Sequence, residues 1–114
     1  MEVPLQVTYR GMPPSEALSE RVREHASKLS TFHRRILGCK VAIDAPSPHH
    51  KHGGHFRVRV DVVVPGAELV VANDDGNVKA EDAYAAVDGV FKNASRVLRE
   101  HQKKQDEHQK KADV

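Results

Sequence analysis

The sequence predicts an α+β fold, a two-layer sandwich in the order β-α-β-β-β-α with a four-stranded sheet and two helices on one face. Four short segments alternate apolar and polar residues, which is typical of strands with one buried face. Two longer segments carry apolar residues three and four apart, which is typical of amphipathic helices. The 114 residues are 39% hydrophobic and contain no Trp, so we expect one domain with a small, mainly aliphatic core.

The first strand and the first helix are predicted from the N-terminal third of the chain. Residues 3–10 alternate, and "GMPPS" then ends the strand. Ser15 is a suitable N-cap for a helix over residues 16–36, and Gly38 is a suitable terminator. The apolar positions of this helix are Leu18, Val22, Ala26, Leu29 and Ile36.

Three further strands are predicted over residues 39–45, 56–64 and 68–72, joined as an antiparallel meander. The first strand, the first helix and the second strand should form a right-handed parallel crossover. The residues expected to face the core are Leu5, Val7, Tyr9, Cys39, Val41, Ile43, Phe56, Val58, Val60, Val62, Val64, Leu69 and Val71.

The last helix should begin at Glu81 or Asp82, with its apolar face formed by Tyr84, Val87, Phe91, Ala94 and Leu98. From about Gln102 the sequence is polar throughout, and we expect it to fray or be disordered. The predicted organisation is therefore a domain over 1–104 and a polar tail over 105–114.

The net charge is only +2, so an argument for nucleic-acid binding depends on where the cations lie. Two rows are expected on the helices: Arg21, Lys28 and Arg35 on the first, and Lys92, Arg96, Arg99 and Lys103 on the last. Arg23 and Arg34 would widen this surface. Such rows suit the phosphates of folded RNA. Solvated helix faces that keep the protein soluble are the alternative.

A Gly- and Pro-rich stretch contains His49, His50, His52 and His55 within seven residues. Imidazoles bind Zn²⁺, Ni²⁺ and Cu²⁺, but a structural zinc site needs ligands on a constrained frame. Three interpretations stay open: a solvated loop, a loop that contacts RNA or responds to pH, and a metal site.

The remaining motifs do not indicate catalysis. Cys39 is the single cysteine, which excludes an internal disulfide and a cysteine-based zinc site, and its strand position indicates packing. The sequence has no glycine-rich phosphate loop, no signal peptide and no apolar run long enough for a membrane helix. We therefore expect a non-enzymatic cytoplasmic protein without a cofactor.

Three segments resemble the ribosome hibernation factors, the family of the ribosome-associated inhibitor and the hibernation-promoting factor (sigma-54 modulation proteins). They are "SEALSERVREHASKLSTFHRRI", "PGAELVVA" and "EDAYAAVDGVFKNASRVLREHQKK". The resemblance covers roughly residues 4 to 104. It implies a fold like that of double-stranded RNA-binding domains and a monomer that corresponds to the short form or the N-terminal domain of the family.

The resemblance also implies a function. Members of this family bind the small ribosomal subunit in the channel for messenger and transfer RNA, contact ribosomal RNA, and block translation. By position, Lys28, Arg35, Arg96 and Lys104 match basic residues of the family, whereas His25, Asn93, Glu100 and Gln102 stand where relatives often carry Lys. The alternatives are a general double-stranded RNA-binding module and a metal-binding protein that uses the histidine loop.

Overall fold

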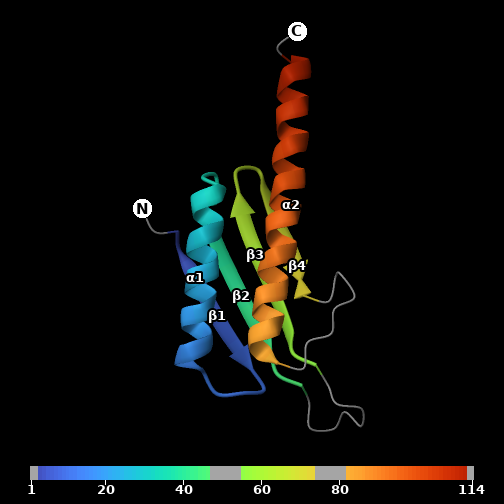
Figure 1. Cartoon of the computed structure of the whole chain (residues 1–114). Coiled ribbons are helices and arrows are strands. Elements are labelled where there is room, and N and C mark those ends of the chain that lie inside the picture. The colour runs from blue at the N-terminus through green and yellow to red at the C-terminus, as the bar shows by residue number, and fades with distance from the viewer. Residues whose placement is uncertain (1–2, 47–54, 74–81, 113–114) are drawn as a thin grey trace.

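The computed structural model describes residues 3–46, 55–73 and 82–112, with side chains described through Glu107. Its elements are β1 (Leu5–Arg10), α1 (Glu16–Phe32), β2 (Gly38–Asp44), β3 (Arg57–Val64), β4 (Ala67–Ala72) and α2 (Ala83–Ala112). Figure 1 shows the two helices side by side on one face of the sheet. The predicted two-layer α+β sandwich is confirmed.

The sheet has the order β1-β2-β3-β4. β1 pairs with β2 in parallel, which is the predicted crossover through α1, and the other two pairs are antiparallel. One register row crosses all four strands through Leu5, Cys39, Val62 and Leu69. Because a slip of one residue would turn every side chain to the other face, the alternating pattern fixes this register.

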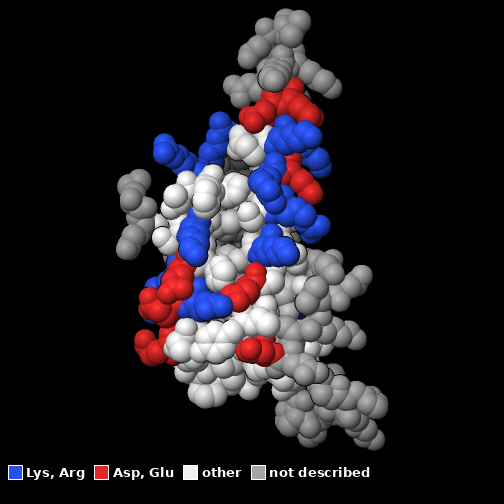
Figure 2. All heavy atoms as spheres, in the orientation of Figure 1, with Lys and Arg blue, Asp and Glu red and all other residues white. Residues whose placement is uncertain are grey.

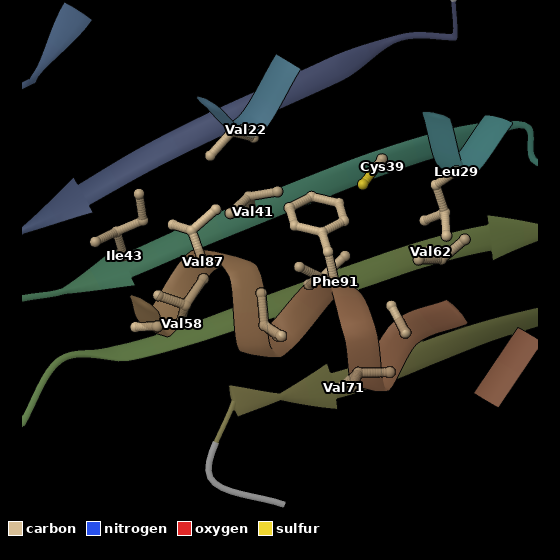
Figure 3. Close-up of a cluster of buried hydrophobic side chains, with 14 of the residues drawn as sticks. Val22, Leu29, Cys39, Val41, Ile43, Val58, Val62, Val71, Val87 and Phe91 are labelled. Atoms are coloured by element: carbon tan, nitrogen blue, oxygen red, sulfur yellow. The ribbon is translucent and has the colours of Figure 1, made fainter. Parts of the chain in front are cut away.

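The core lies between the sheet and the two helices and is almost entirely aliphatic (Figure 3). Val22 of α1 and Val87 of α2 are fully buried against the sheet, and Phe91 adds the one large ring at the centre. Along β3 the predicted alternation is confirmed, because Val58, Val60 and Val62 are all 0% exposed. Each such side chain stabilises the fold by about 1.5–3 kcal/mol through burial.

Helix α1 begins as predicted, because the Ser15 Oγ accepts a hydrogen bond from the Leu18 backbone N–H at 3.2 Å. Its predicted end at residue 36 is wrong. The helix stops at Phe32, and the N–H of the C-cap residue His33 donates to the carbonyl of Leu29.

The apolar spacing alone does not reveal this earlier end. Ile36 lies seven residues after Leu29 and is buried as the pattern requires, but it reaches the core from a turn beyond the helix. The chain must reverse here to enter β2, and the N–H of Leu37 already bonds to the carbonyl of Val63 at 2.7 Å. Gly38 is therefore the first residue of β2 and not a helix terminator.

Helix α2 follows Asp82, whose Oδ1 accepts from the Tyr84 N–H at 2.9 Å. It runs through Ala112, so the expected fraying from about Gln102 is not observed there. Lys, Gln and Glu are good helix formers, and Gln102 bonds to Asp106 one turn later. At about 1.5 Å per residue α2 outreaches the shorter strands, and its second half projects beyond the sheet (Figure 1). The division into a domain and a tail after residue 104 stays a prediction.

Two further observations concern the reactivity of Cys39 and the hydropathy of the helices. Cys39 is 5% exposed, and burial together with the nearby charge of Asp61 raises the pKa of its thiol to about 11. The thiol is therefore protonated at neutral pH, which agrees with the predicted packing role. Within the described part of the chain, no helix is both long and apolar enough to cross a membrane.

Asn73 completes the sheet where β4 ends. It is 2% exposed, its Oδ1 accepts from the Val58 N–H at 2.9 Å, and its Nδ2 donates to the Phe56 carbonyl at 3.0 Å. The amide thus continues the ladder beside β3 by one more pair of hydrogen bonds. Asn93 of α2 donates to the Ala72 carbonyl next to it, which ties the helix to the same strand end.

Asn73→Ala should lower the free energy of unfolding by about 2 kcal/mol, because it leaves the buried N–H of Val58 without a partner. Urea denaturation followed by circular dichroism measures this loss. Gln6→Ala, on the exposed face of β1, is the control and should cost less than about 0.5 kcal/mol. Equal losses for the two variants would contradict the role given to Asn73.

Candidate nucleic-acid interface

Lys and Arg side chains gather on the exposed surface of the two helices. Figure 2 shows Lys and Arg side chains along both helices on either side of a band of uncharged residues. Acidic side chains gather mainly over the first turns of α1 and near the far end of α2. The surface is therefore electropositive over its middle part, where the two helices run next to one another.

The α2 row, which consists of Lys92, Arg96, Arg99 and Lys103, lies on the helix as predicted. All four side chains are exposed. At about 100° per residue they point away from the buried positions such as Val90 and Ala94. Among the described residues, no carboxylate lies within 4.0 Å of these four cations. Their charge is thus available to an anionic partner.

Arg21 differs from this row, because it forms a two-point ion pair with Asp88 of α2. Its Nε and one terminal nitrogen lie 2.9 and 2.8 Å from the two carboxylate oxygens. The hydrogen bond from Arg21 is the main reason why the pKa of Asp88 is lowered to about 2. The guanidinium also lies 6.0 Å from the ring centroid of Tyr84, which is 38% exposed and not buried as predicted. Arg21 is therefore a cross-link between the helices. The prediction that it also contacts RNA stays a prediction.

His25 adds a second link at the same carboxylate. Its Nε2 lies 2.6 Å from an oxygen of Asp88, and its ring stacks on Phe91 with 5.0 Å between centroids. Sequence reasoning noted His25 only as a position where relatives often carry Lys. The structure shows that it joins the packing and the polar contacts between α1 and α2.

Lys28 and Arg35 were predicted to follow Arg21 along α1 in steps of seven residues. Lys28 is on the helix, is exposed and has no carboxylate within 4.0 Å among the described residues. Arg35 is not on the helix, because α1 ends at Phe32 and residues 34–35 form a turn. Of the predicted row, Arg21 and Lys28 therefore lie on α1, and Arg21 is paired with Asp88.

The two arginines expected to widen the surface have different surroundings. Arg23 pairs with Glu20 one turn earlier at 2.8 Å, so its charge is balanced locally. Arg34 stays exposed in the turn after α1, beside Arg35. Lys104 is also exposed, next to the α2 row.

The end of α1 and the projecting part of α2 enclose a cleft of about 410 Å³, which we call the terminal cleft. Its floor is formed by Ile36, Val64 and Leu98, and Arg34 and Arg35 line its rim. A shallower hollow of about 510 Å³ adjoins it, lined by Phe32, His33, Arg99, Gln102, Lys103, Asp106 and Glu107. Burial and the positive charge of Arg99 lower the pKa of His33, which places the α2 row close to the end of α1.

The candidate metal ligands cannot be assembled into a site from the described residues. His49, His50 and His52 lie outside the described residues, and His55 is half-buried just before β3. In residues 3–46, 55–73 and 82–112 no three histidine, cysteine or acidic side chains gather to hold a metal ion. The metal interpretation of the histidine loop stays a prediction without a structural test.

Asp88→Asn should lower stability at pH 7, and the loss should shrink as the pH falls. The pKa of Asp88 is lower in the folded state than its usual value, so its charged form stabilises the fold above about pH 4, and that stabilisation is lost between about pH 4 and pH 2. Urea midpoints at pH 7 and pH 3 measure both effects. Asp106→Asn, an exposed carboxylate that bonds to Gln102, is the control. If the urea midpoints of wild type and Asp88→Asn differ by the same amount at both pH values, the stabilising role given to the charged Asp88 is contradicted.

Comparison with known proteins places this geometry in a family. A family model described as "Sigma 54 modulation protein / S30EA ribosomal protein" matches residues 5–106. Curated protein sequences give no significant match.

Two solved structures share the fold. A ribosomal subunit interface protein from Coxiella burnetii has a TM-score of 0.72 and 17% identity, with 88% of this chain and 98% of that chain covered. The Protein Y N-terminal domain from Thermus thermophilus has a TM-score of 0.67 and 19% identity, with 89% and 99% covered. The family model spans nearly the whole chain, so this protein belongs to the family of sigma 54 modulation proteins and S30EA ribosomal proteins.

Proposed function

We propose that the protein binds the small ribosomal subunit in the cytoplasm and occupies the channel used by messenger and transfer RNA. It blocks translation by occlusion while it is bound, and it carries out no chemical reaction. Contacts between its helix cations and ribosomal RNA phosphates hold it in place. Displacement by other translation factors, and not turnover, ends the inhibition.

Family membership supports a ribosomal partner. The family description names a ribosomal protein, and one of the two structural neighbours is named a ribosomal subunit interface protein. The fold supplies what such a partner needs, because both helices lie on one face and present their outer surfaces together.

The α2 row is the single observation that carries the proposal. Its four cations span residues 92–103, which is roughly 16 Å of helix at about 1.5 Å per residue. Each cation that neutralises a phosphate releases condensed counterions, so the binding energy does not depend on the base sequence. Lys28 on α1 extends the same surface, whereas two of the three guanidinium nitrogens of Arg21 are already bonded to Asp88.

Replacement of Lys92, Arg96 and Arg99 by Gln should lower the affinity for isolated small subunits by at least about tenfold, because three phosphate contacts are lost. Co-sedimentation with the subunits measures this affinity. The control variant carries Gln at Arg10, Lys40 and Arg59 on the opposite face of the sheet, so it loses the same net charge. Circular dichroism confirms that both variants are folded. Equal weakening by the two variants would contradict a docking surface on the helices.

The same sedimentation assay tests whether the protein binds in the channel for messenger and transfer RNA. Small subunits loaded beforehand with messenger RNA and initiator transfer RNA should retain less wild-type protein than empty subunits do. Equal retention would show that the protein binds elsewhere on the subunit. A naked RNA duplex that binds as tightly as the subunit would instead favour a general double-stranded RNA-binding module.

A further inference from the structure

Phe32 is the most exposed large apolar side chain of the described residues, with 80% of its surface accessible. It is the last residue of α1 and lies three and four residues after Leu29 and Lys28. Because the fold does not bury this ring, it is accessible to a partner. Both hollows at this end of the molecule are lined by Phe32.

The terminal cleft next to Phe32 has an unusual lining. Its rim carries the charges of Arg34 and Arg35 together with the imidazoles of His33 and His101. No Asp or Glu lines it. This lining favours an anionic ligand, and the cleft volume of about 410 Å³ is within the range of small-ligand pockets.

The floor of the terminal cleft is apolar. Ile36, Val64 and Leu98 are 7%, 6% and 3% exposed and belong to the main core, so the floor is rigid. A ligand that fits must combine a flat apolar part with negative charge. A nucleotide has both, because its base stacks on aromatic rings and its phosphate pairs with arginine.

We propose that the terminal cleft holds one unpaired nucleotide of RNA, with its base stacked on Phe32 and its phosphate against Arg34 and Arg35. The inference rests on the proposed function, since the α2 row would hold the adjoining RNA backbone. Arg99 and Lys103 of that row line the neighbouring hollow together with Phe32, and Asp106 and Glu107 line it too. The proposed RNA strand passes from the row into the cleft on the side of the two cations. The nucleotide adds recognition of a bulged or single-stranded position to a surface that otherwise reads only phosphates.

Two RNA hairpins that differ by one added nucleotide test this site: one is fully paired, and the other carries a single bulged 2-aminopurine. Wild-type protein should bind the bulged hairpin about tenfold more tightly, and the fluorescence of the bulged base should fall as it stacks. Phe32→Ala should bind both hairpins equally and leave the fluorescence unchanged. Phe32→Tyr keeps an aromatic ring and should keep the preference.

Leu37→Ala is the matched control, because Leu37 is also a large apolar residue with 58% exposure and does not line the cleft. It should behave as the wild type. Preference for the bulge in Phe32→Ala, or its absence in the wild type, would overturn the nucleotide site. Sedimentation of the same proteins with small subunits separates the two proposals. If wild type and Phe32→Ala both sediment but no bulge preference exists, only the nucleotide site fails; if wild type does not sediment, the ribosomal function fails.

Discussion

Burial of a single face of the sheet is the constraint on which the rest of the molecule depends. β3 turns four valines to one side and both of its arginines to the other, so only one face can hold a hydrophobic core. Both amphipathic helices must cover that face, since each has an apolar stripe to bury. Their polar surfaces then lie next to one another, although 50 residues of sequence separate Phe32 from Ala83. The electropositive surface is thus a consequence of how the core is closed.

The charges between the two helices divide into those that hold the fold and those that are left for a partner. Asp88 receives Arg21 and His25, and His25 stacks on Phe91, so this group fixes α1 against α2. Among the described residues, no carboxylate lies within 4.0 Å of the cations of the α2 row. The proposed binding therefore uses Lys and Arg side chains that take no part in the packing of the two helices.

The strands and the topology were predictable because their signals are local. Alternation in residues 56–64 sets which side chains enter the core, and the turn at residues 65–66 sets the hairpin. The end of α1 was not predictable, because Ile36 satisfies the helical spacing whether or not the helix continues. The pairing of Arg21 with Asp88 joins residues 67 apart, and no local pattern reports it. Polar composition likewise does not distinguish the exposed end of α2 from a disordered tail.

The candidate site was predicted in part for the same reason. The α2 row follows from helical periodicity alone, and the structure keeps it intact. Phe32 lies inside the helix predicted over residues 16–36, so its exposure at a helix end was missed. Arg35 was assigned to the row of cations on α1, although it lies in the turn after that helix, because this turn was predicted as helix. Only the tertiary structure brings this turn, the exposed ring and the projecting half of α2 to one cleft.

The salt dependence of binding to the small subunit tests the central claim most directly, because it counts the phosphates that the protein neutralises. The logarithm of the binding constant should fall linearly with the logarithm of salt concentration. Replacing Lys92, Arg96 and Arg99 by Gln should make this slope shallower by about 2 to 3, at roughly 0.7–0.9 per lost phosphate contact. A variant that binds more weakly with an unchanged slope would contradict the account, since its cations would then not be the groups that meet the RNA backbone.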